Sequence, residues 1–557
     1  MNRNNATNAH ANVQRNDNIR TVFVSAVILT VAGIIVKALG FLFRVPLTNL
    51  LGDRGMAYYA PAYDIYTFLL VISTSGIPVA ISRMVAERCA VCDFMGARRV
   101  IIVSRRIAVL LGMIGFLILF FGADLIAKHI VNIPNSAFAM KTIAPALLLV
   151  PAMSAYRGYF QGHQQMLPSA ISEIIEQFFR VCFGLGAALF FVKSYTSVSL
   201  FIASKLELGA GGGSFGASAG AFFGLLTIYV MYRKVQKQEE HFVTCDDNSI
   251  EKDKDLVVSI LSIAVPITIA ASVMPLVNLA DVAIVKHRLV LYCSEAEAEA
   301  LFGQLTSFAA PIIGFPQIII QAIMMSIVPA ISSIKKAQDF NRLNTTVESG
   351  LKLSMLVAFP CSIGIFVLAV PILAVFYPTR LESALNSAPT LRVYAVAFIF
   401  LALLSVATAV LQGIGKQTVA VRNLMIGIVI KIILTWGLTG VEFINARGAA
   451  VGTIGAYSFA AVTDVLAVRN YTGITFNLKK IYIKPFVAAI GMGIIVHVVY
   501  YLLYGFFGKY LIPLSISIIA GAVVYFLLTV KIGLVTKEDI ELLPKGSKLA
   551  HILRMDR

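Results

Sequence analysis

Long apolar segments recur along the whole chain, and they restrict its fold more than any other feature. A run of about 18 or more apolar residues forms a helix long enough to cross the hydrocarbon core of a bilayer. The chain is 58% hydrophobic and only 13% charged, whereas soluble domains average about 25% charged residues. The runs lack the alternating pattern of a membrane β-barrel. The sequence therefore predicts an all-α polytopic membrane protein.

About fourteen transmembrane helices are predicted. They lie near residues 20–42, 58–82, 100–123, 138–160, 168–192, 212–232, 256–285, 303–331, 353–376, 390–412, 418–439, 447–468, 485–505 and 510–530. Most loop Lys and Arg residues then fall on the side that holds both termini. Because cytoplasmic loops are enriched in these residues, we expect both termini in the cytoplasm and the chain in a bacterial cytoplasmic (inner) membrane.

An internal repeat divides the chain into two lobes. One offset aligns Gln161-Gly162 with Gln412-Gly413, Pro78 with Pro329 and Arg180 with Lys431. Two parallel repeats of six spans are typical of two-lobed secondary transporters, whose substrate path runs between the lobes. The predicted order is a cytoplasmic tail (1–19), an N-lobe (20–232), a cytoplasmic linker (233–255), a C-lobe (256–468), two further spans within 469–530 and a cytoplasmic tail (531–557).

The stretch SEIIEQFFR carries four polar side chains within a membrane span. Glu173, Glu176, Gln177 and Arg180 share one helix face, because residues three and four apart are neighbours. A charge facing lipid costs about 2.5–3.5 kcal/mol at the bilayer centre, so this face should meet protein or water. Glu176 and Arg180 have the spacing of an ion pair. Two interpretations stay open: a packing ion pair within one lobe, or the lining of a hydrated cavity, which we favour.

Four further charged side chains are candidates for the same cavity. Lys37 lies deep in the first span, and Arg44 follows two turns later on the same face. Lys431, at the repeat position of Arg180, lies in the middle of its span. Asp64 lies in the outer part of the second span. For Arg44 and Asp64, an interfacial position with the charged end in water is equally expected.

Two lone membrane acids, Asp281 and Asp464, are weaker candidates for an ion-coupling site. Asp281 has Lys286 and Arg288 nearby as possible ion-pair partners. No cofactor or metal is expected, and coupling to the membrane potential or to H⁺ or Na⁺ is left open. No catalytic motif is found, so the chain is not expected to be an enzyme. The net charge of +17 is spread over many loops, and no nucleic-acid partner is expected.

Glycines recur every four residues at the start of the sixth span. Gly212, Gly216, Gly220 and Gly224 form the small-xxx-small pattern that lets two membrane helices approach closely. The sequence therefore predicts tight packing of this helix against a neighbour.

The segment LGFLFRVPLTNLLGDRGMAYYAPAYDIYTFLLVISTSGIPVAISRMVAE, followed by DFMGARRV, resembles the stage V sporulation protein B and MurJ-type lipid II flippase group of the multidrug/oligosaccharidyl-lipid/polysaccharide exporter superfamily. The resemblance implies two six-helix lobes, a central cationic cavity for a lipid-linked sugar diphosphate, and a groove for the polyprenyl tail formed by spans 13 and 14. It also implies a substrate-binding role for Lys37 and Arg44. One departure is that Phe315-Pro316 is preceded by SFAAPIIG, without the arginine that related flippases often carry there.

The expected function is therefore a flippase for an undecaprenyl-pyrophosphate-linked cell-wall precursor, either lipid II or a polysaccharide repeat unit. Its expected partners are the polyprenyl-linked oligosaccharide, membrane lipids and cell-wall synthesis proteins, and it is expected to act as a monomer. One alternative is a cation-coupled multidrug exporter, which would favour an acidic cavity. The other is a non-transporting scaffold in envelope or spore-wall synthesis, whose polar face would be dry and paired.

Overall fold

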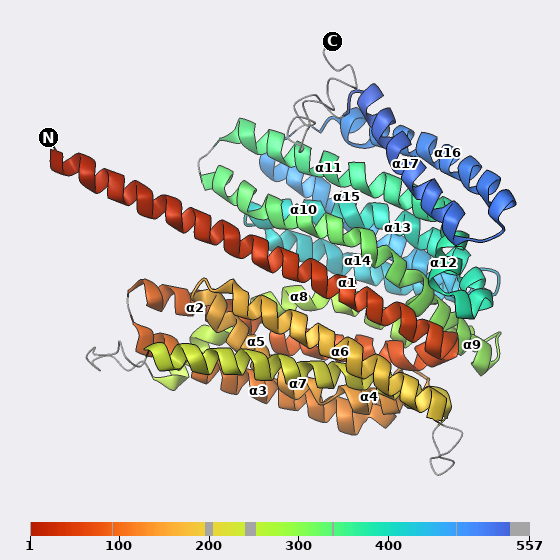
Figure 1. Ribbon diagram of the computed structural model, residues 1–557, viewed down its shortest axis with the longest axis horizontal. Coiled ribbons are helices and arrows are strands. Elements are labelled where there is room, and N and C mark those ends of the chain that lie inside the picture. Colours follow the sequence, from red (N-terminus) through yellow and green to blue (C-terminus); the bar gives the residue numbers. More distant parts are fainter. Residues whose placement is uncertain are drawn as a thin grey trace. The chain divides into compact units, whose positions relative to one another are not determined.

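The structure is a computed structural model. It describes residues 2–91, 93–194, 204–239, 252–336, 339–474 and 476–534. All regular elements in these ranges are helices, which confirms the predicted all-α class (Figure 1). The predicted linker and C-terminal tail lie in part outside the described residues, at 240–251 and 535–557.

The contacts between helices divide the chain into two compact units, residues 1–303 and 304–557. Unit 1 contains α1 (Asn2–Thr74), α2 (Gly76–Ala90), α3 (Phe94–Leu125), α4 (Ala137–Ile143), α5 (Ala146–Gly162), α6 (Met166–Ser194), α7 (Lys205–Glu239), α8 (Asp253–Leu289) and α9 (Glu295–Gly303). Unit 2 begins with a π-helical turn (Gln304–Ala309) and continues with α10 (Ala310–Lys336), α11 (Phe340–Val367), α12 (Ala369–Phe376), α13 (Leu381–Gly413), α14 (Gln417–Thr439), α15 (Arg447–Thr472), α16 (Lys484–Phe507) and α17 (Leu511–Lys531).

Thirteen helical segments of the described chain are long and apolar enough to cross a membrane, and the first of them contains two spans. This segment, Val31–Ala90, has 60 residues, which as one straight helix would be about 90 Å long, roughly three bilayer cores. The rings of Phe43 and Tyr59 nevertheless lie only 6.3 Å apart. The chain therefore reverses between them, at Gly52. The expected loop between the first two spans is reduced to this turn, because helix continues on both sides of it.

Gly52 has φ 71° and ψ −173°, a backbone conformation that is essentially restricted to glycine. We expect Gly52→Ala to lower the free energy of unfolding by about 1–3 kcal/mol, measured by SDS titration in mixed micelles. Gly186→Ala in α6 is the matched control, because a Cβ there would have no neighbour within 4 Å. An effect of Gly52→Ala no larger than that of the control would contradict the strained turn.

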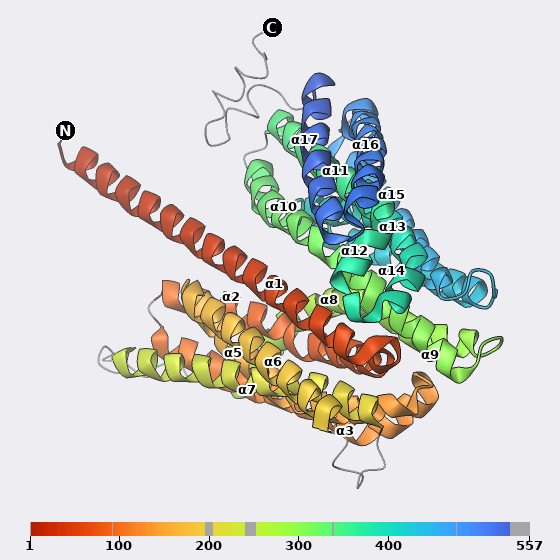
Figure 2. The ribbon, with the colours of Figure 1, turned by 45° about the vertical axis from the view of Figure 1, so that its right-hand side comes forward.

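The last two helices of unit 2 form a hairpin that packs on α11 (Figure 2). The Tyr525 hydroxyl in α17 donates a hydrogen bond of 3.0 Å to the carbonyl oxygen of Leu356, which fixes the hairpin to this helix. Within the same unit, α13 contacts α10, α11 and α15, and most of its inward residues are apolar and buried. The two spans predicted outside the repeat thus pack mainly on α11 of this unit, and α17 also contacts α12.

Helix α8 belongs to unit 1 by its contacts, although the sequence places the lobe boundary earlier, at the 233–255 linker. It packs on α1 and α2, and a Cβ on Gly76 would lie only 2.0 Å from the carbonyl oxygen of Ala264. Asp253 at its first turn pairs with Arg99 of α3, at 2.7 Å. The lobe boundaries stay a prediction, while the structural division falls after Gly303.

Candidate functional site

The glycines of α7 determine how the polar helix α6 is oriented. A Cβ on Gly216 would lie 2.6 Å from the Arg180 carbonyl oxygen, and one on Gly220 would lie 2.4 Å from that of Glu176. The predicted close packing of this glycine stripe is therefore confirmed. Since the backbone of α6 lies directly against α7, its charged side chains extend toward other helices of unit 1.

Glu176 forms an ion pair with Arg157 of α5, and not with Arg180 as its spacing suggested. The guanidinium of Arg157 donates to the Glu176 carboxylate at 2.9 Å and to the Ser172 hydroxyl at 2.9 Å. The side chains of Arg157 and Glu176 are only 13% and 24% exposed. Sequence reasoning missed Arg157, because it lies near the end of a predicted span, where basic residues are usual. Glu173 is half-buried on the same face and close enough to both to interact with their charges.

Arg180 lies on aromatic rings of α1 instead. Its guanidinium carbon is 4.8 Å from the centre of the Tyr63 ring and 5.6 Å from that of Phe43. The Tyr59 and Tyr63 rings are stacked with their centres 6.0 Å apart. Cation–π contacts of this kind contribute about 0.5–2 kcal/mol. The aromatic face of α1 therefore keeps Arg180 as a positive charge within the membrane-spanning part of unit 1.

The remaining predicted residues of α1 and α6 gather around the same contacts. Arg44 and Asp64 are half-buried, and the charges of both act on Tyr63. Gln177 is buried beside Gly40, where a Cβ would lie 3.4 Å from its amide nitrogen. We call this group the α1–α6 cluster; its members are Arg44, Tyr63, Asp64, Arg157, Glu173, Glu176, Gln177 and Arg180.

Lys37 is the exception among the predicted residues of α1. Its side chain is exposed, and within the described part of the chain it takes part in no ion pair or hydrogen bond. It lies seven residues before Arg44, which is two turns along the same helix face. A cation on a membrane helix with no bound carboxylate is available to an anionic ligand.

The predicted residues of unit 2 are deeply buried. Lys431 in α14 is 1% exposed, and Asp464 in α15 is 0% exposed. The Asp464 carboxylate accepts hydrogen bonds from Asn423 at 2.8 Å and from Thr408 at 2.9 Å. These two donors satisfy the carboxylate inside the helix bundle, and sequence reasoning did not identify them. The cavity role of Lys431 and the coupling role of Asp464 stay predictions.

Asp281 in α8 is 8% exposed. Lys286, one of the two partners suggested for Asp281, forms an ion pair with Glu299 of α9, at 3.3 Å. Pairing of Asp281 with Arg288 stays a prediction. Sequence reasoning missed Glu299, because it lies in the acidic run SEAEAEA, a composition typical of a solvated loop.

Within the described ranges, no three His, Cys, Asp or Glu side chains gather in a way that could hold a metal ion.

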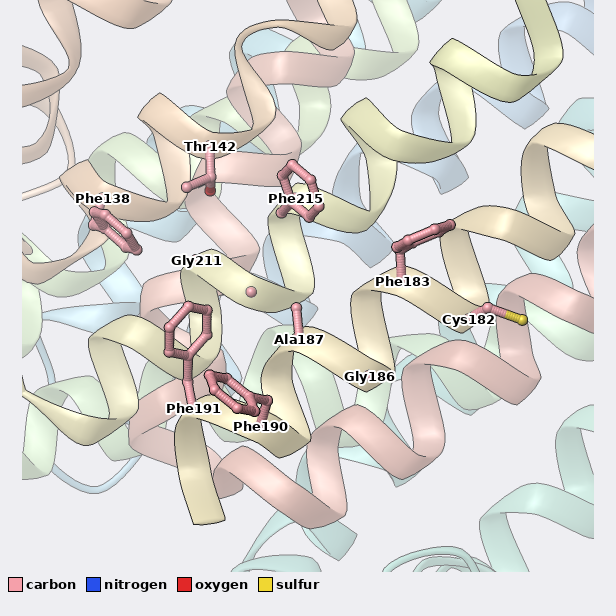
Figure 3. Close-up of a pocket in the computed structure, with 11 residues that line it drawn as sticks. Phe138, Thr142, Cys182, Phe183, Gly186, Ala187, Phe190, Phe191, Gly211 and Phe215 are labelled. Carbon is pink, nitrogen blue, oxygen red and sulfur yellow. The ribbon is translucent and has the colours of Figure 1, made fainter. Parts of the chain in front are cut away.

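An apolar groove of about 540 Å³ lies among α4, α6 and α7 of unit 1 (Figure 3). Its walls carry the rings of Phe138, Phe183, Phe190, Phe191 and Phe215, and Gly211 lies between them. None of the described residues that line the groove is charged, so it suits hydrocarbon rather than a phosphate group. The charged and apolar surfaces of this unit are therefore separate.

The multi-pass helical fold, with charges buried between its first and fifth spans, agrees with the multidrug/oligosaccharidyl-lipid/polysaccharide exporter superfamily that the sequence resembles. The chain belongs to the polysaccharide biosynthesis protein family, whose model matches residues 23–335, and a MatE model matches residues 299–436.

Two relatives extend over nearly the whole chain. Lipid II flippase MurJ of Bacillus subtilis (strain 168) is 26% identical over 92% of this chain and 95% of its own length. Stage V sporulation protein B of the same organism is 25% identical over 94% of this chain and 98% of its own. The resemblance noted in the sequence is confirmed.

Solved structures agree on the fold. A structure described as lipid II flippase MurJ in an inward closed conformation has a TM-score of 0.66, with 15% identity over 90% of this chain and 98% of that chain. An inward-facing multidrug resistance MATE family transporter has a TM-score of 0.62, with 12% identity over 78% of this chain and 94% of that chain. The first of these two structures is described as a flippase and the second as a transporter.

Proposed function

We propose that the protein is a flippase that moves an undecaprenyl-pyrophosphate-linked cell-wall precursor, such as lipid II or a polysaccharide repeat unit, from the inner to the outer leaflet of the cytoplasmic membrane. The observation that carries the proposal is Lys37, an exposed cation without an acidic partner among the described residues, on the helix that also holds Arg44. A pyrophosphate is costly to move through hydrocarbon, and Lys and Arg lower that cost by charge-assisted hydrogen bonds.

In this proposal the head group crosses between two lobes that alternate their access, while the polyprenyl tail stays in lipid. Both termini lie in the cytoplasm, as the distribution of loop Lys and Arg indicates. The protein works as a monomer. Asp281 and Asp464 would couple transport to an ion, or the membrane potential would drive it.

The second candidate is a cation-coupled multidrug exporter, which the MatE match over 299–436 favours. Such a transporter needs a free acidic group for cationic drugs. Glu176 is already neutralised by Arg157 at 2.9 Å, which weakens this candidate.

Reconstitution separates the two candidates. The wild-type protein in proteoliposomes should move fluorescent lipid II between leaflets, and it should not move a cationic dye under an imposed H⁺ or Na⁺ gradient. Empty liposomes are the control. Dye transport without lipid II transport would replace the flippase by the exporter, and transport of neither would favour a scaffold or another lipid-linked sugar.

A further inference from the structure

A second groove lies in unit 2, between α10 and α11, which run side by side (Figure 1, Figure 2). The two helices approach closely within it, where a Cβ on Gly350 would lie 2.6 Å from the Ile327 side chain. The volume of the groove is about 570 Å³, within the usual range for ligand sites. We call it the α10–α11 groove. It differs from the apolar groove of unit 1, because its lining changes from apolar to polar along its length.

The apolar part of the lining lies toward the middle of the membrane spans. It consists of Ile319 and Ile323 in α10 and Leu353 in α11. The polar part lies toward the connection between the two helices, which the proposed orientation places in the cytoplasm. It carries four hydroxyl groups, those of Ser326, Thr345, Thr346 and Ser349. The groove therefore begins among lipid tails and ends at the inner surface of the membrane.

The length of α11 places the polar part at the level of the lipid head groups. The helix has 28 residues and is therefore about 42 Å long, whereas the hydrocarbon core is about 30 Å thick. The predicted span began only at residue 353, but the helix begins at Phe340. The residues from Phe340 to Lys352 thus form helical turns on the cytoplasmic side of the hydrocarbon core.

Lys352 lies where the lining changes from apolar to polar. It follows Ser349 by three residues, so the two side chains share one helix face. Lys352 is half-buried, and within the described chain it takes part in no ion pair or hydrogen bond. Glu348, one turn earlier, is not paired with it. A lysine at the edge of the hydrocarbon core is therefore available to an anionic group such as a phosphate.

The hydroxyl groups retain capacity for further hydrogen bonds. Those of Thr345 and Thr346 donate to the Arg342 carbonyl oxygen at 3.1 and 2.7 Å, and a hydroxyl that donates one hydrogen bond can still accept others. Ser349 is exposed, and its hydroxyl donates no hydrogen bond within the described chain. Donors and acceptors of this kind suit the hydroxyl groups of a sugar.

The order of side chains along the groove matches the order of chemical groups in the proposed substrate. From the middle of the membrane toward the cytoplasm, the groove presents isoleucines, then Lys352, then hydroxyl groups. A lipid-linked sugar diphosphate presents a hydrocarbon tail, then the diphosphate, then the sugar. We infer that the α10–α11 groove is a docking site, where this substrate binds from the inner leaflet before it is transported. The inference rests on the proposed flippase function. An ordinary phospholipid, which has a tail and a phosphate but no sugar, is the competing ligand.

Protection of a thiol in the groove distinguishes the two ligands. In a full-length chain with its six cysteines replaced, Ser349→Cys reacts with a hydrophilic maleimide in phosphatidylcholine nanodiscs. Added lipid II should slow this reaction at least about fivefold, and an equal amount of phosphatidylglycerol should slow it less than about twofold. The control is Thr418→Cys, at an exposed position in the first turn of α14, which neither lipid should protect.

The outcomes separate the docking site from the proposed function. Equal protection by phosphatidylglycerol would overturn the docking site and leave a general phospholipid surface. No protection by lipid II, in a protein that moves lipid II in proteoliposomes, would also overturn the docking site and leave the flippase intact. Protection in a protein that moves no lipid II would support the docking site and refute the flippase. Neither protection nor transport would overturn both.

Transport kinetics test the role of Lys352. Lys352→Ala should raise the lipid II concentration for half-maximal transport at least about fivefold and keep the maximal rate within twofold, whereas a purely structural role would lower the maximal rate. Lys352→Arg should restore the half-maximal concentration. Lys234→Ala, which removes an exposed lysine of α7, is the control and should change neither quantity. An unchanged half-maximal concentration in Lys352→Ala would overturn the docking site.

Discussion

Replacing Lys37 by alanine is expected to reduce lipid II transport about 10–100-fold while the protein stays folded. A hydrogen bond to a charged group contributes about 1.5–3 kcal/mol, and its loss would affect a diphosphate directly. Lys37 has no ion pair or hydrogen bond within the described chain, so its removal breaks no native contact. A charge in the membrane costs free energy. The free energy of unfolding should therefore be unchanged or slightly higher in Lys37→Ala.

Two variants make this prediction specific for a cation at this position. Lys37→Arg keeps the charge and should retain a large part of the transport rate. Lys193→Ala removes an exposed lysine in the last turn of α6 and should have no effect on transport. Wild-type transport by Lys37→Ala would exclude Lys37 from the substrate path. Loss of transport together with loss of folding would mean that the side chain has a structural role.

Arg157→Ala is expected to lower the free energy of unfolding by about 3 kcal/mol. The substitution leaves the Glu176 carboxylate, 24% exposed, with Glu173 nearby and without its cation. Breaking a buried pair costs about 3–5 kcal/mol, reduced here because water reaches part of the site. The measurement is SDS titration in mixed micelles, followed by circular dichroism.

The chain contains a matched control for this experiment. Arg83 and Glu87 of α2 form a pair of 2.8 Å with side chains 64% and 59% exposed, and Arg83→Ala should cost less than about 1 kcal/mol. The double variant Arg157→Met with Glu176→Leu should recover most of the lost stability, because it leaves no unpaired charge. If Arg157→Ala costs no more than Arg83→Ala, the pair is hydrated and lines a water-filled cavity instead.

The helix pattern could be predicted because it depends on local composition. Apolar segment length and the glycine repeat of α7 are properties of single helices, and both are confirmed. The turn at Gly52 was harder to predict. The residues around it, including Pro46, have the composition of a loop, but in the structure they continue the helices on both sides. A single glycine with a positive φ is enough to reverse the chain there.

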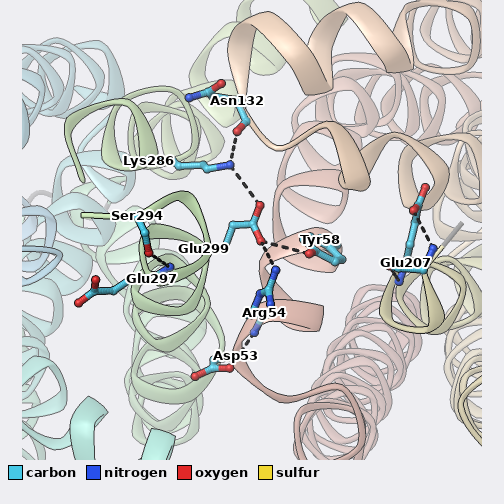
Figure 4. A network of polar contacts seen from close by, with 10 residues as sticks. Asp53, Arg54, Tyr58, Asn132, Glu207, Lys286, Ser294, Glu297 and Glu299 are labelled. Carbon is cyan, nitrogen blue, oxygen red and sulfur yellow. Dashed lines mark hydrogen bonds and ion pairs between the residues drawn. The ribbon is translucent and has the colours of Figure 1, made fainter. Parts of the chain in front are cut away.

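The ion pairs were less predictable, because they depend on which helices become neighbours. The spacing of Glu176 and Arg180 describes one isolated helix, whereas in the structure Arg157 arrives from α5 and the aromatic rings of α1 take Arg180. Glu299 is similar: its sequence surroundings are acidic and look solvated, but Arg54 and Tyr58 of the distant α1, together with Lys286 of α8, surround it (Figure 4). No periodicity encodes such long-range partners.

The glycine stripe of α7 has a consequence for how variants of this protein should be interpreted. The rotation of α6 about its own axis is determined by residues such as Gly216 and Gly220, which have no functional group. One added methyl at either position would meet a carbonyl oxygen of α6 at 2.6 or 2.4 Å and would turn or shift the whole charged face. Random mutagenesis should therefore recover inactive variants at these glycines as often as at the charges themselves. Identical charged residues in a homologue are therefore not enough to infer the same site there, unless the glycines of α7 are present as well.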